Sequence, residues 1–126
     1  MRERSLKAIH RLAANDPRVV FIGSDLGAGV LDEFRTDFPD RFFMEGVSEQ
    51  AIIGTAAGLA MEGYVPFVNT LATFLTRRCY EQIAIDLCLQ NLPVRLLDTA
   101  AAWCTRRLGL PILPSKTSAC CGCCRT

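Results

Sequence analysis

The sequence predicts an α/β fold in which a mainly parallel sheet is flanked by helices. Apolar runs of strand length at residues 19–22 and 65–69 are typical of strands that are covered on both faces. Segments with helical spacing or small apolar composition lie between and beside these runs. Because helices and strands alternate along the chain, we expect the strands to run parallel.

The first predicted unit is a helix, a strand and a loop. The helix is indicated by apolar residues at helical spacing, namely Leu6, Ile9, Leu12 and Ala13. Residues 15–17 end this pattern, and the strand at 19–22 follows. The loop at 23–27 then lies at the carboxyl end of that strand, which is where open α/β sheets bind ligands.

The other elements are expected in this order: a turn at 38–40, a short strand at 41–45, a helix at 48–61, a strand at 65–69, a long helix at 74–89 and a strand at 93–97. Gly63 is the expected C-cap of the helix at 48–61, because glycine adopts the left-handed conformation that ends many helices.

Composition narrows the classes of function. Fourteen basic residues stand against 13 acidic ones, so the charge gives no reason to expect nucleic acid or an anionic membrane as a partner. No apolar stretch reaches the roughly 18 residues that a membrane span needs. Residues 1–12 carry charges throughout and lack the apolar core of a signal peptide. We therefore expect a cytoplasmic protein.

The last part of the sequence does not continue the alternating pattern. Residues 98–126 hold neither helical nor strand periodicity for more than a few positions. Five of the seven cysteines lie in this tail: Cys104, Cys120, Cys121, Cys123 and Cys124. A disulfide framework is not expected in a cytosolic chain. We therefore expect an incomplete three-layer domain at residues 1–97 and a poorly structured tail at 98–126.

Several short motifs occur in an order that is typical of one protein family. They are Asp16-Pro17-Arg18-Val19-Val20, Ser24-Asp25-Leu26-Gly27, Phe38-Pro39-Asp40-Arg41-Phe42-Phe43, Glu45-Gly46-Val47-Ser48-Glu49-Gln50, Phe74-Leu75-Thr76-Arg77 and Asn91-Leu92-Pro93-Val94. Through them the first 97 residues resemble the pyrimidine-binding domain of transketolases, and most of all the C-terminal subunit of split transketolases.

This resemblance implies thiamine diphosphate as the cofactor and ketol transfer between sugar phosphates as the reaction. The Gly-Asp-Gly motif with which transketolases hold the diphosphate and its Mg²⁺ or Ca²⁺ is absent from this sequence. The resemblance therefore implies a separate diphosphate-binding subunit as partner, with a homo-oligomer as the expected assembly. We expect the chain as written to be inactive alone.

Glu49 is the residue to which the resemblance assigns catalysis. The glutamate of the family motif hydrogen-bonds the aminopyrimidine ring, which helps that ring remove a proton from the reacting carbon of the cofactor. From the residues alone a second interpretation stays open. A glutamate in the first turn of a helix also stabilises that helix by complementing its dipole.

Three further residues are implied to bind the cofactor. Phe74 would pack against the pyrimidine ring, although an ordinary core phenylalanine is the alternative. Asp25 would lie near the cofactor and the subunit interface, although a turn aspartate that bonds its own backbone is equally simple. Arg77 would face cofactor or substrate, although a solvated helix arginine is also compatible with the pattern. No metal ligand is predicted in this chain.

Alternative functions remain open. Within the same cofactor family, the chain could be a β subunit of a 2-oxo acid dehydrogenase or a fragment similar to deoxyxylulose-phosphate synthase. From a different class, Cys120-Cys121-Gly122-Cys123-Cys124 could mark a non-catalytic metal-binding or interaction module, since four thiolates are a possible ligand set for zinc. Adjacent cysteines suit a structural zinc site poorly, because its usual Cys-x-x-Cys pairs are well separated.

A shifted reading frame explains the tail. The codons of residues 98–104 can be re-read, one base out of frame, as Gly-His-Gly-Gly-Gly-Leu-Val. The same shift lets residues 108–119 encode a segment with Gly-Pro-Thr-His and an acidic pair, as the family has at this point. We therefore interpret residues 98–126 as the product of one base lost after the codon of Leu97.

Overall fold

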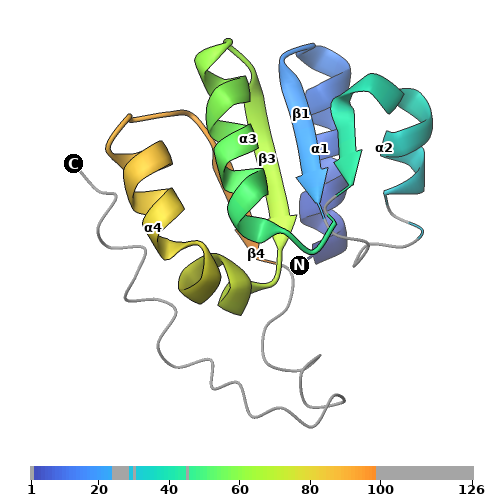
Figure 1. Cartoon of the computed structure of the whole chain (residues 1–126). Coiled ribbons are helices and arrows are strands. Elements are labelled where there is room, and N and C mark those ends of the chain that lie inside the picture. The colour runs from blue at the N-terminus through green and yellow to red at the C-terminus, as the bar shows by residue number, and fades with distance from the viewer. Residues whose placement is uncertain (1, 24–28, 30, 45, 99–126) are drawn as a thin grey trace, which may run out of the picture.

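The computed structural model describes residues 2–23, 29, 31–44 and 46–98. In this part of the chain four strands form one sheet: β1 (Val19–Gly23), β2 (Phe42–Met44), β3 (Val65–Thr70) and β4 (Arg95–Asp98). Their spatial order is β2-β1-β3-β4, and each neighbouring pair is parallel (Figure 1). The prediction of a parallel α/β sheet is confirmed.

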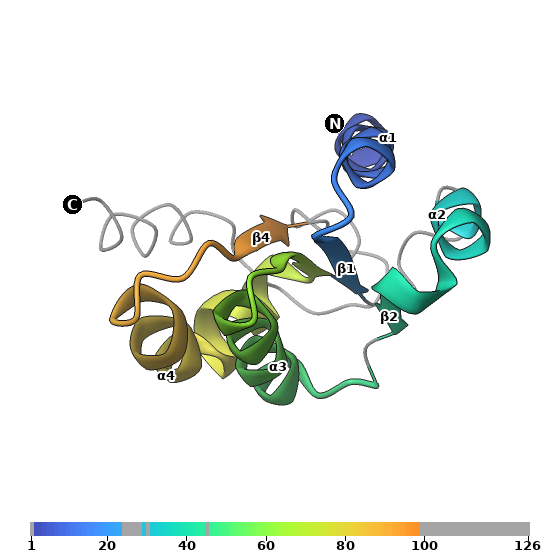
Figure 2. The same cartoon turned by 90° about the horizontal axis from the view of Figure 1, so that it is seen from above.

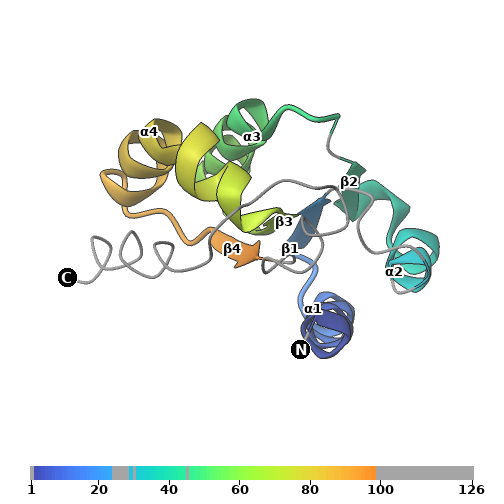
Figure 3. The same ribbon diagram turned by 90° about the horizontal axis from the view of Figure 1, so that it is seen from below.

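Helices cover both faces of the sheet. Helices α1 (Arg2–Asn15) and α2 (Asp32–Asp37) lie on one side, and α3 (Glu49–Met61) and α4 (Tyr80–Gln82) lie on the other (Figures 2 and 3). Helix α4 lies between two π-helical segments, η2 (Phe74–Arg78) and η3 (Ile83–Cys88). The result is the three-layer arrangement that the sequence predicts.

Strand β1 is a central strand, and its position accounts for its continuous apolar sequence. All five of its residues are buried, because the strand lies between β2 and β3 and has helices on both faces. Val19 and Phe21 join the core under α1 and α2, while Val20 and Ile22 join the core under α3. The alternation of a strand therefore supplies both cores from one continuous apolar segment.

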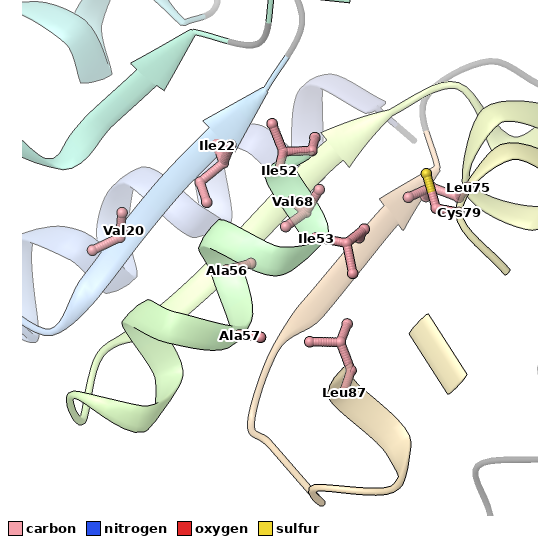
Figure 4. Packing of buried hydrophobic residues seen from close by; sticks show 10 residues of the cluster. All are labelled: Val20, Ile22, Ile52, Ile53, Ala56, Ala57, Val68, Leu75, Cys79 and Leu87. Atoms are coloured by element: carbon pink, nitrogen blue, oxygen red, sulfur yellow. The ribbon is translucent and has the colours of Figure 1, made fainter. Parts of the chain in front are cut away.

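The core under α3 contains ten buried residues (Figure 4): Val20, Ile22, Ile52, Ile53, Ala56, Ala57, Val68, Leu75, Cys79 and Leu87. The second core is built by α1, α2 and the opposite face of the sheet: Leu6, Ile9, Ala13, Val19, Phe21, Leu31 and Phe34. Leu6, Ile9 and Ala13 thus form the buried face of α1, as predicted, whereas Leu12, the fourth residue of the predicted pattern, is 49% exposed.

The expected C-cap of α3 is confirmed. Gly63 has a φ of 89°, in the left-handed region that glycine adopts without strain. Its N–H donates to the carbonyl of Ala60 at 3.1 Å, and the N–H of Tyr64 donates to the carbonyl of Leu59 at 3.0 Å. This pair of bonds is the Schellman motif, which satisfies carbonyls at the end of the helix and turns the chain into β3.

Three parts of the chain differ from the prediction. The sequence did not indicate α2 or the short 3₁₀ helix at Pro39–Arg41, because α2 has only six residues and buries only Phe34. The single long helix predicted at 74–89 is instead three short segments, with Cys79 between η2 and α4 at φ −116° and ψ 13°. Tertiary packing widens these turns, as the bond from Leu89 N–H to Ala84 O at 2.9 Å shows.

Within the described residues, no helix is long and apolar enough to cross a membrane.

Candidate functional site

The order of the strands identifies one edge of the sheet as the place for a ligand. The chain leaves β1 to form β2 on one side, and then crosses over to form β3 on the other side of β1. In open parallel sheets, ligands bind outside the carboxyl ends of the two strands where this reversal occurs. Here those ends are Gly23 of β1 and Asn69–Thr70 of β3, and Gly23 pairs with Asn69 in register.

Glu49 lies at this edge because α3 begins there. The chain runs from the carboxyl end of β2 directly into α3, and Glu49 is the first residue of the helix. Just before it, Val47 has a φ of 59°, a left-handed conformation that is strained for a β-branched residue. This conformation lies in the turn between β2 and α3, two positions before the candidate catalytic residue.

The carboxylate of Glu49 is buried, with 2% of the residue exposed. Arg78 Nη1 donates a hydrogen bond of 2.7 Å to Oε2 of Glu49. Burying a carboxylate costs several kcal/mol in lost solvation, and this charge-assisted bond offsets part of that cost. The positive end of the helix dipole, at the N-terminus of α3, acts in the same direction.

Phe74 lies next to this ion pair. It begins η2, shortly after the carboxyl end of β3, and its side chain is half-buried. The guanidinium carbon of Arg78 lies 3.9 Å from the centre of the Phe74 ring, within the range of a cation–π interaction. Glu49 and Phe74, the two residues that the sequence analysis singled out, are therefore joined through Arg78.

Packing in the core determines which residues of η2 face Glu49. Leu75 and Cys79 are four positions apart, and both are buried in the core under α3 (Figure 4). Phe74 and Arg78 each precede one of them, so they lie together on the neighbouring face of this turn. A further bond, from Gln50 Nε2 to the carbonyl of Arg78 at 2.9 Å, ties the end of η2 to the start of α3.

Arg78 is the residue that the sequence analysis missed. Arg77 was singled out one turn after Phe74, and in the structure it is exposed. Arg78 is four residues after Phe74, and residues at this spacing are neighbours on a helix, so the sequence alone could have indicated Arg78. Asp25, the remaining candidate, lies outside the described residues, as do the five cysteines of the tail.

The described part of the chain contains no cluster of three or more His, Cys, Asp or Glu side chains that could hold a metal ion. What the site offers is a buried carboxylate beside an aromatic ring, at the edge of the sheet where a ligand is expected. This pair can hydrogen-bond one edge of a planar nitrogen heterocycle and pack against its face.

The chain is similar in sequence and in fold to known proteins. Residues 1–102 match the family model described as "Transketolase, pyrimidine binding domain". A 1-deoxy-D-xylulose-5-phosphate synthase of Clostridium perfringens (strain SM101 / Type A) is 49% identical over 92 residues, which cover 71% of this chain. The 1-deoxy-D-xylulose-5-phosphate synthase 1 of Geobacter metallireducens is 45% identical over 89 residues, or 70% of this chain.

Among solved structures, one described as "Split gene transketolase, inactive beta4 tetramer" is similar to this chain, with a TM-score of 0.71 and 36% identity. The match covers 77% of this chain and 33% of that chain. The matched region is 15% of the Clostridium synthase and 14% of the Geobacter synthase. This chain thus spans only a small part of the length of the curated relatives it matches.

Proposed function

The chain belongs to the family of transketolase pyrimidine-binding domains, and from this premise we propose that it supplies the pyrimidine side of a thiamine diphosphate site for ketol transfer. The observation that carries the proposal is the buried carboxylate of Glu49 beside Phe74, at the carboxyl edge of the sheet. When bound, thiamine diphosphate supplies the carbon nucleophile that attacks the substrate carbonyl.

The residues present fit an aminopyrimidine ring. The guanidinium of Arg78, a planar group with N–H donors, is already bonded to Glu49 and lies over Phe74. An aminopyrimidine is also planar, so its face can pack on Phe74 while one of its ring nitrogens accepts a hydrogen bond from the protonated carboxyl of Glu49.

Each residue of the site has a proposed role in binding the cofactor. Glu49 holds a proton in a hydrogen bond to a ring nitrogen of the pyrimidine, and its burial keeps water from competing for that bond. Phe74 packs against the ring and fixes its plane. We further propose that Asp25 and Arg77 contact the cofactor or the substrate.

A separate diphosphate-binding subunit, holding Mg²⁺ or Ca²⁺, completes the proposed site. The proposal that the chain assembles with this subunit and with copies of itself is supported by apolar side chains at both edges of the sheet. Phe43 and Met44 of β2 are 44% and 50% exposed, and Leu96 of β4 is 36% exposed. Edge strands with exposed apolar side chains favour contact with another chain.

A second candidate is the formation of 1-deoxy-D-xylulose 5-phosphate. The curated relatives at 49% and 45% identity carry the name of that synthase. A single assay separates the two candidates. This chain, with its tail restored to the family continuation, is mixed with the diphosphate-binding subunit, thiamine diphosphate and Mg²⁺. Ketol exchange between sugar phosphates is the expected result. Formation of deoxyxylulose phosphate alone would favour the second candidate, and no product of either kind would contradict the proposed function.

The non-catalytic alternative makes different predictions. A cysteine-rich metal module would contain stoichiometric zinc by metal analysis, and its properties would not respond to thiamine diphosphate. We expect the opposite for this chain, namely no stoichiometric zinc and a response to thiamine diphosphate that depends on Glu49.

A further inference from the structure

The burial of Glu49 restricts the access of a ligand to its carboxylate. A ligand can hydrogen-bond this carboxylate only by reaching it, yet 2% of the residue is exposed. Arg78 lies directly against the carboxylate, at 2.7 Å, and its own side chain is 43% exposed. The ion pair is therefore closed on the side of Glu49 and open to solvent on the side of Arg78.

The guanidinium of Arg78 lies where the proposed function places the aminopyrimidine ring, although it donates to Glu49, whereas the ring nitrogen would accept from the protonated carboxyl. It donates an N–H to Glu49, and it lies with its central carbon 3.9 Å from the centre of the Phe74 ring. Two planar groups cannot share one position between the same carboxylate oxygen and the same ring face. If the aminopyrimidine uses these contacts, Arg78 must first give them up.

We propose that Arg78 is a placeholder, which occupies the pyrimidine position in the cofactor-free chain and swings into solvent when the ring of thiamine diphosphate enters. This inference rests on the proposed function, because it takes Glu49 and Phe74 as contacts of the cofactor. In the absence of cofactor, Arg78 provides the counter-ion that lets Glu49 stay buried. When the ring enters and the guanidinium leaves, the Glu49 carboxylate takes up a proton from solvent, and its hydrogen bond to a ring nitrogen replaces the bond from Arg78.

The backbone around Arg78 is held while its side chain is free to move. The carbonyl of Arg78 accepts the hydrogen bond from Gln50, and the next residue, Cys79, is fully buried in the core. The side chain itself is joined to the site by one ion pair and one cation–π contact. Water can solvate the exposed guanidinium once it leaves, but it cannot replace the bond at the buried carboxylate, so Arg78 leaves only when the ring takes over the contact with Glu49. The movement itself is a change of side-chain rotamer.

Calorimetric titration of the full chain tests this proposal. Thiamine diphosphate is the first probe. Thiamine is the second probe, because it carries the same ring without the diphosphate, so that a lost attraction between arginine and phosphate cannot hide the effect. Arg78→Ala is expected to bind thiamine about tenfold more tightly than the wild type, or about 1.4 kcal/mol. Arg78→Lys keeps the charge without the planar group and is expected to show a smaller gain.

Arg35→Ala is the matched control. It removes the same charge from α2, across the sheet, where the arginine is exposed. It is expected to bind both probes as the wild type does. Equal or weaker binding of thiamine by Arg78→Ala would overturn the placeholder, because the arginine would then support the ring instead of competing with it. Absence of binding by every variant would also overturn it, since the vacated position would not accept the ring.

Nuclear magnetic resonance gives a second measurement that does not depend on affinity. The Nε–Hε signal of Arg78 is identified by its loss in Arg78→Ala, and it is expected to shift as thiamine is added to the wild type. A signal that stays in place while the ring binds would contradict the proposal. The proposed function is tested separately by Glu49→Gln. If Glu49→Gln binds thiamine as tightly as the wild type, the role of Glu49 fails, whatever Arg78 does.

Discussion

Arg78 and Glu49, which are 29 positions apart in the sequence, form a hydrogen-bonded ion pair of 2.7 Å at the carboxyl edge of the sheet. The pair joins the start of α3 to the end of η2, the two segments that carry the candidate site. It also places one cationic group against both the buried carboxylate and the ring of Phe74. The site is thus a small network, and its stability depends on the core beneath it.

A substitution at Ile53 tests how much the core under α3 contributes to stability. This residue is fully buried in the cluster under α3, so Ile53→Ala removes apolar contacts that the neighbouring side chains cannot replace. We expect the free energy of unfolding to fall by about 2–5 kcal/mol. Ile85→Ala is the matched control, because Ile85 is 49% exposed, and it is expected to cost less than about 1 kcal/mol. Urea denaturation of both variants measures the difference. Equal losses of unfolding free energy in Ile53→Ala and Ile85→Ala would contradict the placement of Ile53 in the core and of Ile85 at the surface.

Val47 tests the strain before α3. Its side chain is 80% exposed and its φ is 59°, so Val47→Gly loses little burial and relieves about 1–2 kcal/mol of left-handed strain. The backbone freedom of glycine offsets about 0.5–1 kcal/mol of this gain. We expect stability to stay equal or to rise slightly. The same change at Val65, in β3, is expected to destabilise the protein. A clear loss of stability in Val47→Gly would exclude strain at this residue.

Asp16 tests the pH dependence of the turn between α1 and β1. Its side chain accepts hydrogen bonds from Arg18, from Nη2 at 2.8 Å and from the backbone N–H at 2.9 Å. The side-chain bond, followed by the backbone bond, lowers the pKa of Asp16 below its ordinary value of 3.8. A lowered pKa stabilises the folded state above pH 3.8, and this stabilisation is lost as the pH falls through the lower value.

Asp16→Asn should therefore show a smaller loss of stability than the wild type as the pH falls below about 4. Thermal unfolding of the two proteins between acidic and neutral pH measures this difference. Asp40→Asn is the control, because Asp40 is exposed on the surface, and its acid dependence should match that of the wild type. If Asp16→Asn and the wild type lose the same stability as the pH falls, the hydrogen bonds from Arg18 do not stabilise the folded protein through the Asp16 carboxylate.

The sequence was informative where one physical requirement dominated. The apolar run at 19–22 predicted a central strand because β1 is covered on both faces. Gly63 predicted the end of α3 because few other residues adopt its conformation. Glu49 and Phe74 came from a resemblance in motifs, and the structure places both beside the same arginine.

Other features depended on tertiary packing and could not be predicted in this way. The π-helical turns of η2 are held by Leu75 and Cys79 in the core, and this arrangement brings Arg78 to Glu49 while Arg77 is exposed. The left-handed φ of Val47 runs against the local preference of a β-branched residue, so no sequence rule indicates it. Helix α2 is too short for its periodicity to be recognised.

The origin of the tail has its own test. Of the tail only Asp98 is described, as the last residue of β4, and the family model matches the chain as far as residue 102. Sequencing the genomic DNA across the codon of Leu97 is expected to reveal a frame that restores the glycines, Gly-Pro-Thr-His and the acidic pair. The gene upstream is expected to encode the diphosphate motif. A frame without such a continuation would exclude the frameshift, and an adjacent gene for a lipoyl domain would instead favour a 2-oxo acid dehydrogenase.

The most direct test of the central claim is the rate of ketol transfer by Glu49→Ala. The frame-restored chain is combined with the diphosphate-binding subunit, thiamine diphosphate and Mg²⁺, and Glu62→Ala serves as the control. Glu62 lies exposed immediately after the other end of α3. We predict that Glu49→Ala lowers turnover by at least about 100-fold, the usual contribution of a positioned acid, while Glu62→Ala leaves it unchanged. Near-normal turnover by Glu49→Ala would contradict the role assigned to this carboxylate.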